Sequence, residues 1–428
     1  MTGRYKAYPT YKSSNFEWLG DIPKHWDVVY SKWLFSERKV KAQLTDEMLT
    51  ASQKYGVIPQ KVFMDLEQQK VVQVQKGHDI LKQVKKNDFV ISMRSFQGGI
   101  EFCDYDGAVS SAYVPLESRN NGYSTYFKYL FKSKPYIQAL QATTNLVRDG
   151  QALRFTNFTQ VRLPLPTESE AQCIGTFLHH ETAKIDTLIT KQEKLIELLK
   201  EKRQSVISHA VTKGLNPDAP MKDSGVEWLG DVPEHWENKR IKNCASLISE
   251  KATIENQMVV ALENIEGFTG NYISSQSHYT GEDVAFIKGD ILFGKLRPYL
   301  SKVFHCSTNG VAFGDLLTYR PMKDTHPLFL FYVMISSWFI DVVDSSTYGA
   351  KMPRASSDFV DKMYIAVPPL EEQIAIANSL KESLLALDEL SNKANAAIEL
   401  MKERKTALIS AVVTGKIDVR EWQENAQR

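Results

Sequence analysis

The sequence predicts an α+β fold in which two related globular α/β domains are separated by two long helices that form an antiparallel coiled coil. Three observations predict it. Two runs of more than thirty residues contain neither glycine nor proline and carry apolar residues at alternating steps of four and three. A motif built around two tryptophans precedes each half of the chain. Between the motif and the helical run, each half has a passage that is rich in expected β-strands.

The helical runs carry an apolar seam along one side, because steps of four and three return to the same side of a helix. Adding 202 to each number of the first seam gives the second, and the basic break at Arg203 then falls on Lys405. From Leu178 to Ala210 the seam is about 48 Å long at a rise of ~1.5 Å per residue. A small domain cannot cover that length, so we expect the two runs to pack on each other. Burial of each helix within its own half, and dimerisation of the chain, are the alternatives.

The apolar seam residues are Leu178, Ile185, Ile189, Ile196, Leu199, Val206, Leu380, Leu384, Leu387, Ile398, Met401 and Leu408.

The repeated motif occurs at residues 17–26 and again at 227–236, an offset of 210. Its Gly-Asp-x-Pro sequence predicts a turn, and its tryptophans are large enough to hold that turn against a neighbouring surface. We interpret it as a structural anchor. The order of anchor, domain and helix occurs twice, so a two-fold relation between the halves makes the helices antiparallel. It also brings the end of the second helix, near Thr414, close to the N-terminal anchor.

The predicted boundaries follow this order. They are an anchor at 1–26, a first domain at 27–167, a first helix at 168–213, a connector with the second anchor at 214–236, a second domain at 237–369, a second helix at 370–414 and a C-terminal tail at 415–428.

The domains repeat in skeleton but differ in their loops. A polar turn and strand at 86–94 have a counterpart at 288–297, and Gly107–Leu116 has one at Gly310–Tyr319. We expect one aromatic helix in each half, over 126–140 and 329–341. Residues 27–80 and 237–280 share little. A scaffold that is repeated with changed loops indicates two readers of two different targets.

The composition is that of a globular protein, with 43% hydrophobic and 24% charged residues in 428. This length suggests two to four domains. No apolar run reaches the ~18 residues of a membrane span, and the N-terminus does not resemble a secretory signal. The four cysteines show no Cys-x-x-Cys spacing, which disfavours a zinc ribbon and fits a reducing cytoplasm.

The net charge of +1 hides a difference between the two domains. Residues 27–167 hold 19 Lys and Arg against 13 Asp and Glu, which gives +6, and residues 237–369 hold 13 against 14, which gives −1. The first domain can therefore contact phosphates, although the total does not identify a nucleic-acid binder.

Catalytic patterns are missing from the sequence. It has no phosphate-binding Gly-x-x-x-x-Gly-Lys-Ser/Thr loop and no Gly-x-Gly-x-x-Gly cofactor turn. Pro368-Pro369 lacks the flanking residues of an amino-methyltransferase pocket, and Asp290 with Lys295 is too common a pairing to indicate a nuclease. A binding function is therefore favoured over an enzyme.

Three motifs together resemble one family. They are the anchor Trp-Leu-Gly-Asp-x-Pro-x-His-Trp, the helix start Pro-Pro-Leu-Glu-Glu-Gln373 and the helix end Leu-Ile-Ser-Ala-Val-Val-Thr-Gly-Lys-Ile417. The chain resembles the specificity subunit of type I restriction-modification systems over nearly its whole length. In the first half, Pro166-Thr-Glu-Ser-Glu-Ala-Gln172 is a loosened version of the helix start.

The resemblance implies two target recognition domains that each read half of a bipartite, asymmetric site in double-stranded DNA. It implies that the paired helices act as a spacer and bind two modification (methyltransferase) subunits, which use S-adenosylmethionine to methylate adenine. Restriction subunits that use ATP and Mg²⁺ would join the larger anti-phage complex. This chain would bind no cofactor or metal and would have no catalytic residues.

Candidate DNA contacts lie in the loops, where arginine and lysine can bind phosphates and arginine or glutamine can read bases. For each, a solvated surface charge is an equally valid interpretation. The candidates are Arg94, Gln97, Arg148, Gln151 and Arg154 in the first half, and Lys295, Arg297, Lys351 and Arg354 in the second.

Two other functions remain open at this point. The chain could be a coiled-coil scaffold that binds proteins without reading DNA sequence. It could also be a methyltransferase or nuclease that acts alone, although the missing cofactor motifs speak against this.

Overall fold

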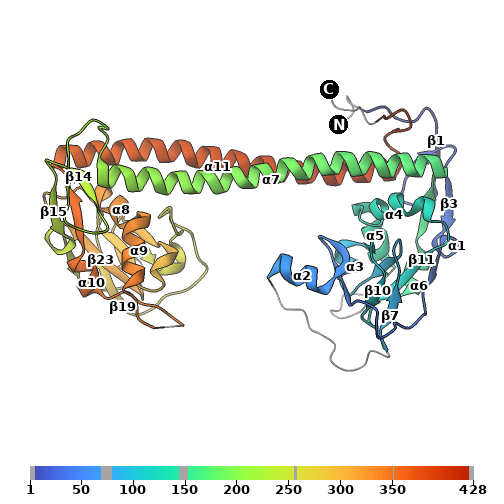
Figure 1. The fold of residues 1–428 in the computed structure, drawn as a ribbon, viewed down its shortest axis with the longest axis horizontal. Helices are drawn as coiled ribbons and strands as arrows, with labels where there is room; N and C mark the ends of the chain where they lie inside the picture. Colours follow the sequence, from blue (N-terminus) through green and yellow to red (C-terminus); the bar gives the residue numbers. More distant parts are fainter. Residues whose placement is uncertain (1–4, 69–79, 144–152, 255–257, 350, 424–428) are drawn as a thin grey trace. The chain divides into compact units, whose positions relative to one another are not determined.

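The computed structural model describes residues 5–68, 80–143, 153–254, 258–349 and 351–423 (Figure 1). The chain divides into two compact units, which we call unit 1 (Met1–Lys191 with Ala397–Arg428) and unit 2 (Gln192–Ala396). Each unit holds a globular α/β domain, part of helix α7 (Glu168–Lys213) and part of helix α11 (Leu370–Val413).

In unit 1 the largest sheet has the strand order β4-β11-β8-β9, and four two-stranded sheets pair β1 with β2, β3 with β12, β5 with β6 and β7 with β10. The strands are β1 (Tyr11–Ser13), β2 (Asp21–Pro23), β3 (Asp27–Tyr30), β4 (Phe35–Glu37), β5 (Leu49–Ser52), β6 (Gly56–Pro59), β7 (Lys82–Val84), β8 (Phe89–Ile91), β9 (Glu101–Phe102), β10 (Gly107–Val109), β11 (Val114–Ser118) and β12 (Arg162–Leu165). The short helices are α1 (Ser31–Leu34), α2 (Gln60–Glu67), α3 (Ser95–Gly98), α4 (Ser124–Leu130), α5 (Lys134–Ala142) and α6 (Phe155–Gln160), with a 3-10 turn η2 (Asn121–Tyr123).

Unit 2 repeats the largest sheet as β16-β23-β20-β21 and adds a second four-stranded sheet, β17-β19-β22-β18, with the pairs β13-β14 and β15-β24. The strands are β13 (Met221–Asp223), β14 (Asp231–Pro233), β15 (Glu237–Arg240), β16 (Ala245–Ile248), β17 (Lys251–Thr253), β18 (Met258–Val260), β19 (Glu282–Phe286), β20 (Ile291–Gly294), β21 (Val303–His305), β22 (Gly310–Ala312), β23 (Leu316–Pro321) and β24 (Tyr364–Val367). The helices are α8 (Pro327–Ile335), α9 (Ser337–Ser345) and α10 (Ser357–Lys362), with 3-10 turns η3 (Ile241–Asn243), η4 (Leu262–Asn264) and η5 (Pro298–Leu300).

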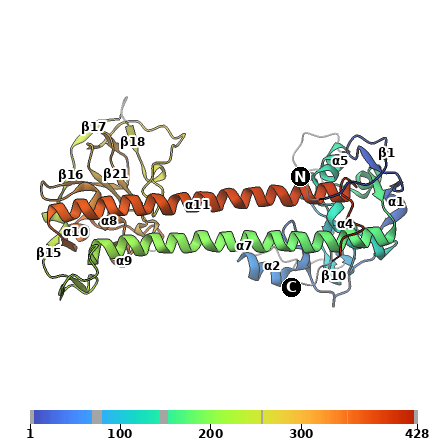
Figure 2. The same cartoon turned by 90° about the horizontal axis from the view of Figure 1, so that it is seen from above.

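The two long helices are antiparallel within each unit. In unit 1, Leu178 near the start of α7 shares a core with Val412 near the end of α11. In unit 2 the order is reversed, because Val211 near the end of α7 shares a core with Leu380 near the start of α11. Figure 2 shows the paired segments side by side. The predicted fold class, two repeated α/β domains with two long antiparallel helices, is thereby confirmed.

The seam residues face inward to different degrees. Six are buried, namely Leu178, Ile185, Leu380, Leu384, Ile398 and Leu408. The other six are partly buried, namely Ile189, Ile196, Leu199, Val206, Leu387 and Met401.

Each long helix begins and ends for the same local reasons. Acidic residues occupy the first turn, Glu168 and Glu170 in α7 and Glu371 and Glu372 in α11, where they face the positive end of the helix dipole. Gly214 and Gly415 follow the last turns with φ of 76° and 74°. This left-handed backbone ends a helix at little cost only in glycine.

The single aromatic helix expected in each half is wrong, because each is two helices. A serine breaks both, with extended backbone at Ser133 and Ser336. The Ser133 Oγ donates to the carbonyl of Leu130 at 2.7 Å, and the Ser336 Oγ donates to that of Val333 at 2.6 Å. Each hydroxyl thus satisfies a carbonyl at the end of one helix and allows the next to start in a new direction.

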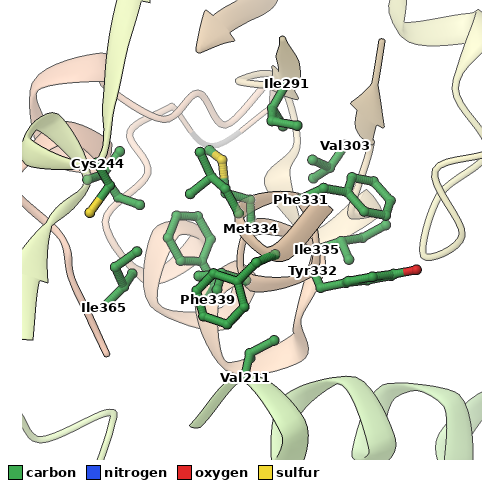
Figure 3. Close-up of a cluster of buried hydrophobic side chains, with 14 of the residues drawn as sticks. Val211, Cys244, Ile291, Val303, Phe331, Tyr332, Met334, Ile335, Phe339 and Ile365 are labelled. Carbon is green, nitrogen blue, oxygen red and sulfur yellow. The ribbon is translucent and has the colours of Figure 1, made fainter. Parts of the chain in front are cut away.

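The core of unit 2 lies around α8 and α9. Figure 3 shows their side chains Phe331, Met334 and Phe339 among residues from the strands, and Val211 from α7 beside them. No single described helix is long and apolar enough to span a membrane; the bent pair α8 and α9, at 59°, passes that test only when the two are taken together.

The anchors fasten the ends of the long helices. Trp26 and Trp236 are fully buried. A Cβ on Gly415 would lie 3.3 Å from the Trp26 ring, and one on Gly214 would lie 3.3 Å from the Trp236 ring. Each anchor in unit 1 and unit 2 therefore packs on the end of the helix that enters that unit from the other half of the sequence.

Candidate nucleic-acid interface

In unit 2 two separate loops combine into one surface. The first follows β20 and contains Lys295 and Arg297, and the second follows α9 and ends at Arg354. The backbone N–H of Arg297 donates to the carbonyl of Pro353 at 2.8 Å, and that of Ala355 donates to the carbonyl of Lys295 at 2.9 Å. Leu296 and Arg354 form an isolated antiparallel bridge. The predicted DNA contacts of the first loop, Lys295 and Arg297, thus lie next to Arg354 of the second loop, although the two loops are far apart in the sequence.

One carboxylate connects the basic side chains of this surface. Arg354 Nη2 lies 2.9 Å from Asp315 Oδ2, and Lys295 Nζ lies 3.6 Å from Asp315 Oδ1. Arg297 and Lys351 are exposed on the same two loops. Four basic side chains against one carboxylate leave an excess of positive charge, which is the property that binds a phosphate backbone.

Large side chains are exposed among these basic residues. Tyr299, Tyr348 and Met352 are 46%, 65% and 59% exposed. Exposed side chains of this size that gather in one place usually mark an interaction surface. Since they adjoin the basic loops, the surface can offer both charge and flat apolar contacts.

In unit 1 the equivalent position, after strand β8, holds the short helix α3. Arg94 and Gln97 are exposed there, next to exposed Met93 and Phe96. The structure therefore brings Arg94 and Gln97 together on one turn, as their spacing in the sequence suggests.

Three side chains hold this turn by its carbonyl groups. Gln53 Nε2 donates to the carbonyl of Arg94 at 3.2 Å, and Gln141 Nε2 donates to that of Phe96 at 2.6 Å. Lys132 Nζ donates to the carbonyl of Gly98 at 3.0 Å. These hydrogen bonds fix the backbone of the turn, while the side chains of Arg94 and Gln97 are exposed to solvent.

A buried carboxylate lies beneath the same turn. Glu101 is 1% exposed, and its Oε1 accepts from Lys132 Nζ at 2.5 Å. Burial raises the pKa of Glu101 from 4.5 to about 7, although the Lys132 ammonium acts in the opposite direction. The charge of this carboxylate therefore changes near neutral pH.

The remaining candidates of unit 1 are placed only in part. Arg154 is exposed at the N-cap of α6, and its backbone N–H donates to Asn157 Oδ1 at 3.0 Å. Arg148 and Gln151 lie outside the described residues.

The two units pair an equivalent buried carboxylate with arginines at different positions. Asp88 and Asp290 occupy the same turn, before β8 and before β20. Asp88 pairs with Arg38 at 2.6 Å, whereas Asp290 pairs with Arg320 at 2.9 Å. The position of Arg320 holds Glu117 in unit 1, and Glu117 also pairs with Arg38, at 2.9 Å. The shared turn is thus kept while the surrounding charges differ.

Sequence reasoning missed Asp315, Lys132, Gln53 and Gln141. Asp315 could have been found from the sequence. When Gly107–Leu116 is aligned with Gly310–Tyr319, Asp315 aligns with Ala112. Because Ala112 has no carboxylate, this difference beside the basic loops indicates that the two halves bind different targets. Among the described residues, no group of three or more His, Cys, Asp and Glu side chains could hold a metal ion.

Comparisons with known proteins point in one direction. Residues 23–198 and 233–400 match the family described as the type I restriction modification DNA specificity domain. The chain is 24% identical over 438 residues to the type I restriction enzyme MjaVIII specificity subunit of Methanocaldococcus jannaschii, which covers 96% of this chain and 97% of that protein. It is 22% identical over 295 residues to the EcoDI specificity subunit of Escherichia coli, which covers 64% of this chain and 66% of that protein.

Solved structures share the fold. A chain from a structure described as the basis of complex assembly and conformational transition of the type I R-M system aligns with a TM-score of 0.70 at 13% identity, over 92% of this chain and 99% of that one. The HsdS subunit from Thermoanaerobacter tengcongensis aligns with a TM-score of 0.54 at 13% identity, over 92% and 98% of the two chains.

Proposed function

Because this chain belongs to the family of type I restriction-modification DNA specificity proteins, we propose that each of its two units reads one half of a bipartite, asymmetric DNA site. The chain is a specificity subunit with two target recognition domains. The observation that carries the proposal is the pair of loop surfaces at equivalent places in the two units. Both follow the same strand of the repeated sheet, β8 or β20, yet they differ in nearly every side chain that they expose.

The chemistry of these surfaces supports contact with DNA. In unit 2, Arg297 and Lys351 are exposed and suited to phosphate oxygens, which give the salt-dependent part of the affinity. In unit 1, Arg94 and Gln97 stand on a turn whose backbone is held by three side chains. Arginine and glutamine are also the residues that pair with guanine and adenine in the major groove. Unlike surfaces predict unlike half-sites.

The paired helices support a role in assembly. Six leucines on α7 and α11 are between 42% and 66% exposed, namely Leu188, Leu195, Leu198, Leu385, Leu390 and Leu400. Exposed apolar side chains mark a protein interaction surface where they form a larger patch. We infer that two modification subunits dock on α7 and α11 and that restriction subunits join through them.

We also infer that methylation and cleavage belong to those partners, which would use S-adenosylmethionine, ATP and Mg²⁺, and that this chain acts with them in the cytoplasm. The sequence carries none of the cofactor motifs that such reactions need. Incubation of the purified chain with DNA and labelled S-adenosylmethionine should transfer no label, and transfer would assign catalysis to this chain.

Selection from random duplexes tests DNA reading directly. The reconstituted complex of this chain with its modification subunits should enrich two short, different sequences at a fixed separation in the presence of competitor DNA. A protein-binding scaffold would enrich no sequence, and that outcome would contradict the proposed function.

A further inference from the structure

Among the predicted DNA contacts of unit 2, Arg354 has both its backbone and its side chain held by hydrogen bonds. Its N–H donates to the carbonyl of Tyr348 at 3.1 Å and its carbonyl accepts from the Tyr348 N–H at 3.4 Å. The bridge to Leu296 holds it from the other side. The loop end that carries Arg354 is therefore fixed to the loop after β20.

Asp315 holds the side chain. The Asp315 side chain is 23% exposed and lies 2.9 Å from Arg354 Nη2. The carbonyl of Asp315 accepts from the Lys295 N–H at 3.0 Å, which fixes its backbone between β22 and β23. An arginine fixed by a carboxylate loses less conformational entropy when it binds than a free one does.

The fixed guanidinium retains donors for a ligand. Arginine carries five N–H donors in a planar fork, and the contact with Asp315 Oδ2 uses one of them. The Arg354 side chain is 47% exposed, so the other donors remain open to an incoming group. Two parallel N–H donors match the O6 and N7 acceptors of guanine in the major groove, the commonest specific contact between protein and DNA.

The charge balance also favours a base over a phosphate at this residue. Asp315 shields part of the charge of Arg354, although Lys295 Nζ, at 3.6 Å, shares the same carboxylate. Arg297 and Lys351 are exposed on the same loops and are better suited to phosphate oxygens. Guanine offers neutral acceptors, which the neighbouring carboxylate disfavours far less. In unit 1 the position aligned with Asp315 is Ala112, which has no carboxylate to hold an arginine.

We propose that Asp315 is a positioning residue that orients Arg354 to read a guanine in the half-site bound by unit 2. This rests on the proposed function, because it names one base contact within it. It assigns a role to Asp315, and it predicts that one half-site of the recognised sequence contains a required G·C pair whose guanine is contacted by Arg354.

The test maps methylated adenines across the genome of cells that carry the full complex with variants of this chain. Arg354→Ala and Arg354→Lys should each lose about 10- to 100-fold of the discrimination at one G·C pair of one half-site, while the other half-site stays unchanged. Asp315→Asn should relax the same pair to a smaller extent, since it keeps the shape but weakens the hold on Arg354. Lys351→Ala, an exposed change in the same loop, should lower methylation without altering the sequence recognised.

Two results would overturn the proposal. One is an unchanged recognition sequence for Arg354→Ala and Asp315→Asn. The other is an equal loss of methylation at all sites by these variants while their melting temperatures match the wild type, which would make Arg354 a phosphate contact. Failure of the proposed function itself would look different, because the wild-type chain would then direct no methylation at any specific sequence.

Discussion

Arg203 of α7 and Asp388 of α11 form an ion pair of 2.6 Å between Nη1 and Oδ1 in unit 2. In unit 1, Asp186 of α7 and Lys405 of α11 form the corresponding pair, also at 2.6 Å. Adding 202 to Asp186 gives Asp388, and adding 202 to Arg203 gives Lys405. The repeat thus places an acidic and a basic residue on each helix, and antiparallel pairing brings each basic residue to the acidic residue of the other helix.

Removal of the partner of Arg203 should destabilise unit 2. Arg203 is only 11% exposed on its side chain, so Asp388→Ala leaves a charge that is largely buried without its carboxylate. We expect a loss of about 1–3 kcal/mol in the free energy of unfolding. Glu389→Ala is the matched control, because its pair with Lys393 is exposed and lies within one helix. Equal midpoints of denaturation by urea for the two variants would contradict this account of the pair.

The reversed pair should recover stability. Arg203→Asp alone places two carboxylates together and should destabilise unit 2 more than Asp388→Ala does. Combining Arg203→Asp with Asp388→Arg restores opposite charges, so the double variant should unfold at a higher urea concentration than Arg203→Asp. A double variant that is no more stable than the single one would show that the pair adds nothing beyond the packing of Arg203 itself.

The carboxyl of Glu101 should make stability depend on pH. Burial raises its pKa from 4.5 to about 7 in the folded chain. Between those values the folded protein holds a proton that the unfolded chain releases, so stability falls as pH rises from about 4.5 to about 7 and then levels. The loss is up to about 3 kcal/mol. Glu101→Gln should flatten the profile of melting temperature against pH, and a variant with the wild-type slope would refute the assignment to Glu101.

The end of α11 should tolerate no side chain at Gly415. Its φ is 74°, and a Cβ there would lie 2.3 Å from Cδ of Pro23 in the N-terminal anchor. Gly415→Ala should cost about 2–4 kcal/mol, from backbone strain and overpacking together. Gly225→Ala is the control, because φ is 65° and nothing lies within 4 Å of its Cβ. It should cost only the strain, about 1 kcal/mol. Similar melting temperatures for both would argue against close packing of α11 on the anchor.

Arg154 should contribute to DNA affinity but not to folding. It is exposed at the N-cap of α6, so Arg154→Ala should leave the melting temperature unchanged. Loss of one phosphate contact lowers the slope of log affinity against log salt by about 0.9. Lys12→Ala, an exposed change on β1, should alter neither quantity. Unchanged affinity of the Arg154→Ala complex at moderate salt would remove Arg154 from the DNA contacts.

Much of the fold was predictable because periodicity and duplication can be recognised in the sequence without knowing which residues are in contact. The seam from Leu178 and the repeated anchor at Trp26 and Trp236 predicted two antiparallel helices in a repeated fold. The serine breaks at Ser133 and Ser336 were missed, since aromatic residues continue the helical pattern on both sides. Pro135, in the first turn of α5, was a signal for the first break.

The site was less predictable. Basic residues in loops can be found in the sequence, but their partners depend on which strands pair. Asp315 contacts Arg354 because the loop after β20 forms a bridge with the loop after α9, and no local sequence pattern predicts that contact. The basic break at Arg203 was visible, yet its meaning required Asp388 on the other helix. The domain boundaries and the DNA contacts remain predictions.

The most direct test of the central claim is the map of methylated adenines in cells with and without this chain, the modification subunits being present in both. The account predicts one bipartite sequence with two unlike halves at a fixed separation, methylated only when the chain is present. A methylated sequence that persists without the chain, or one that is continuous or symmetric in its presence, would contradict it.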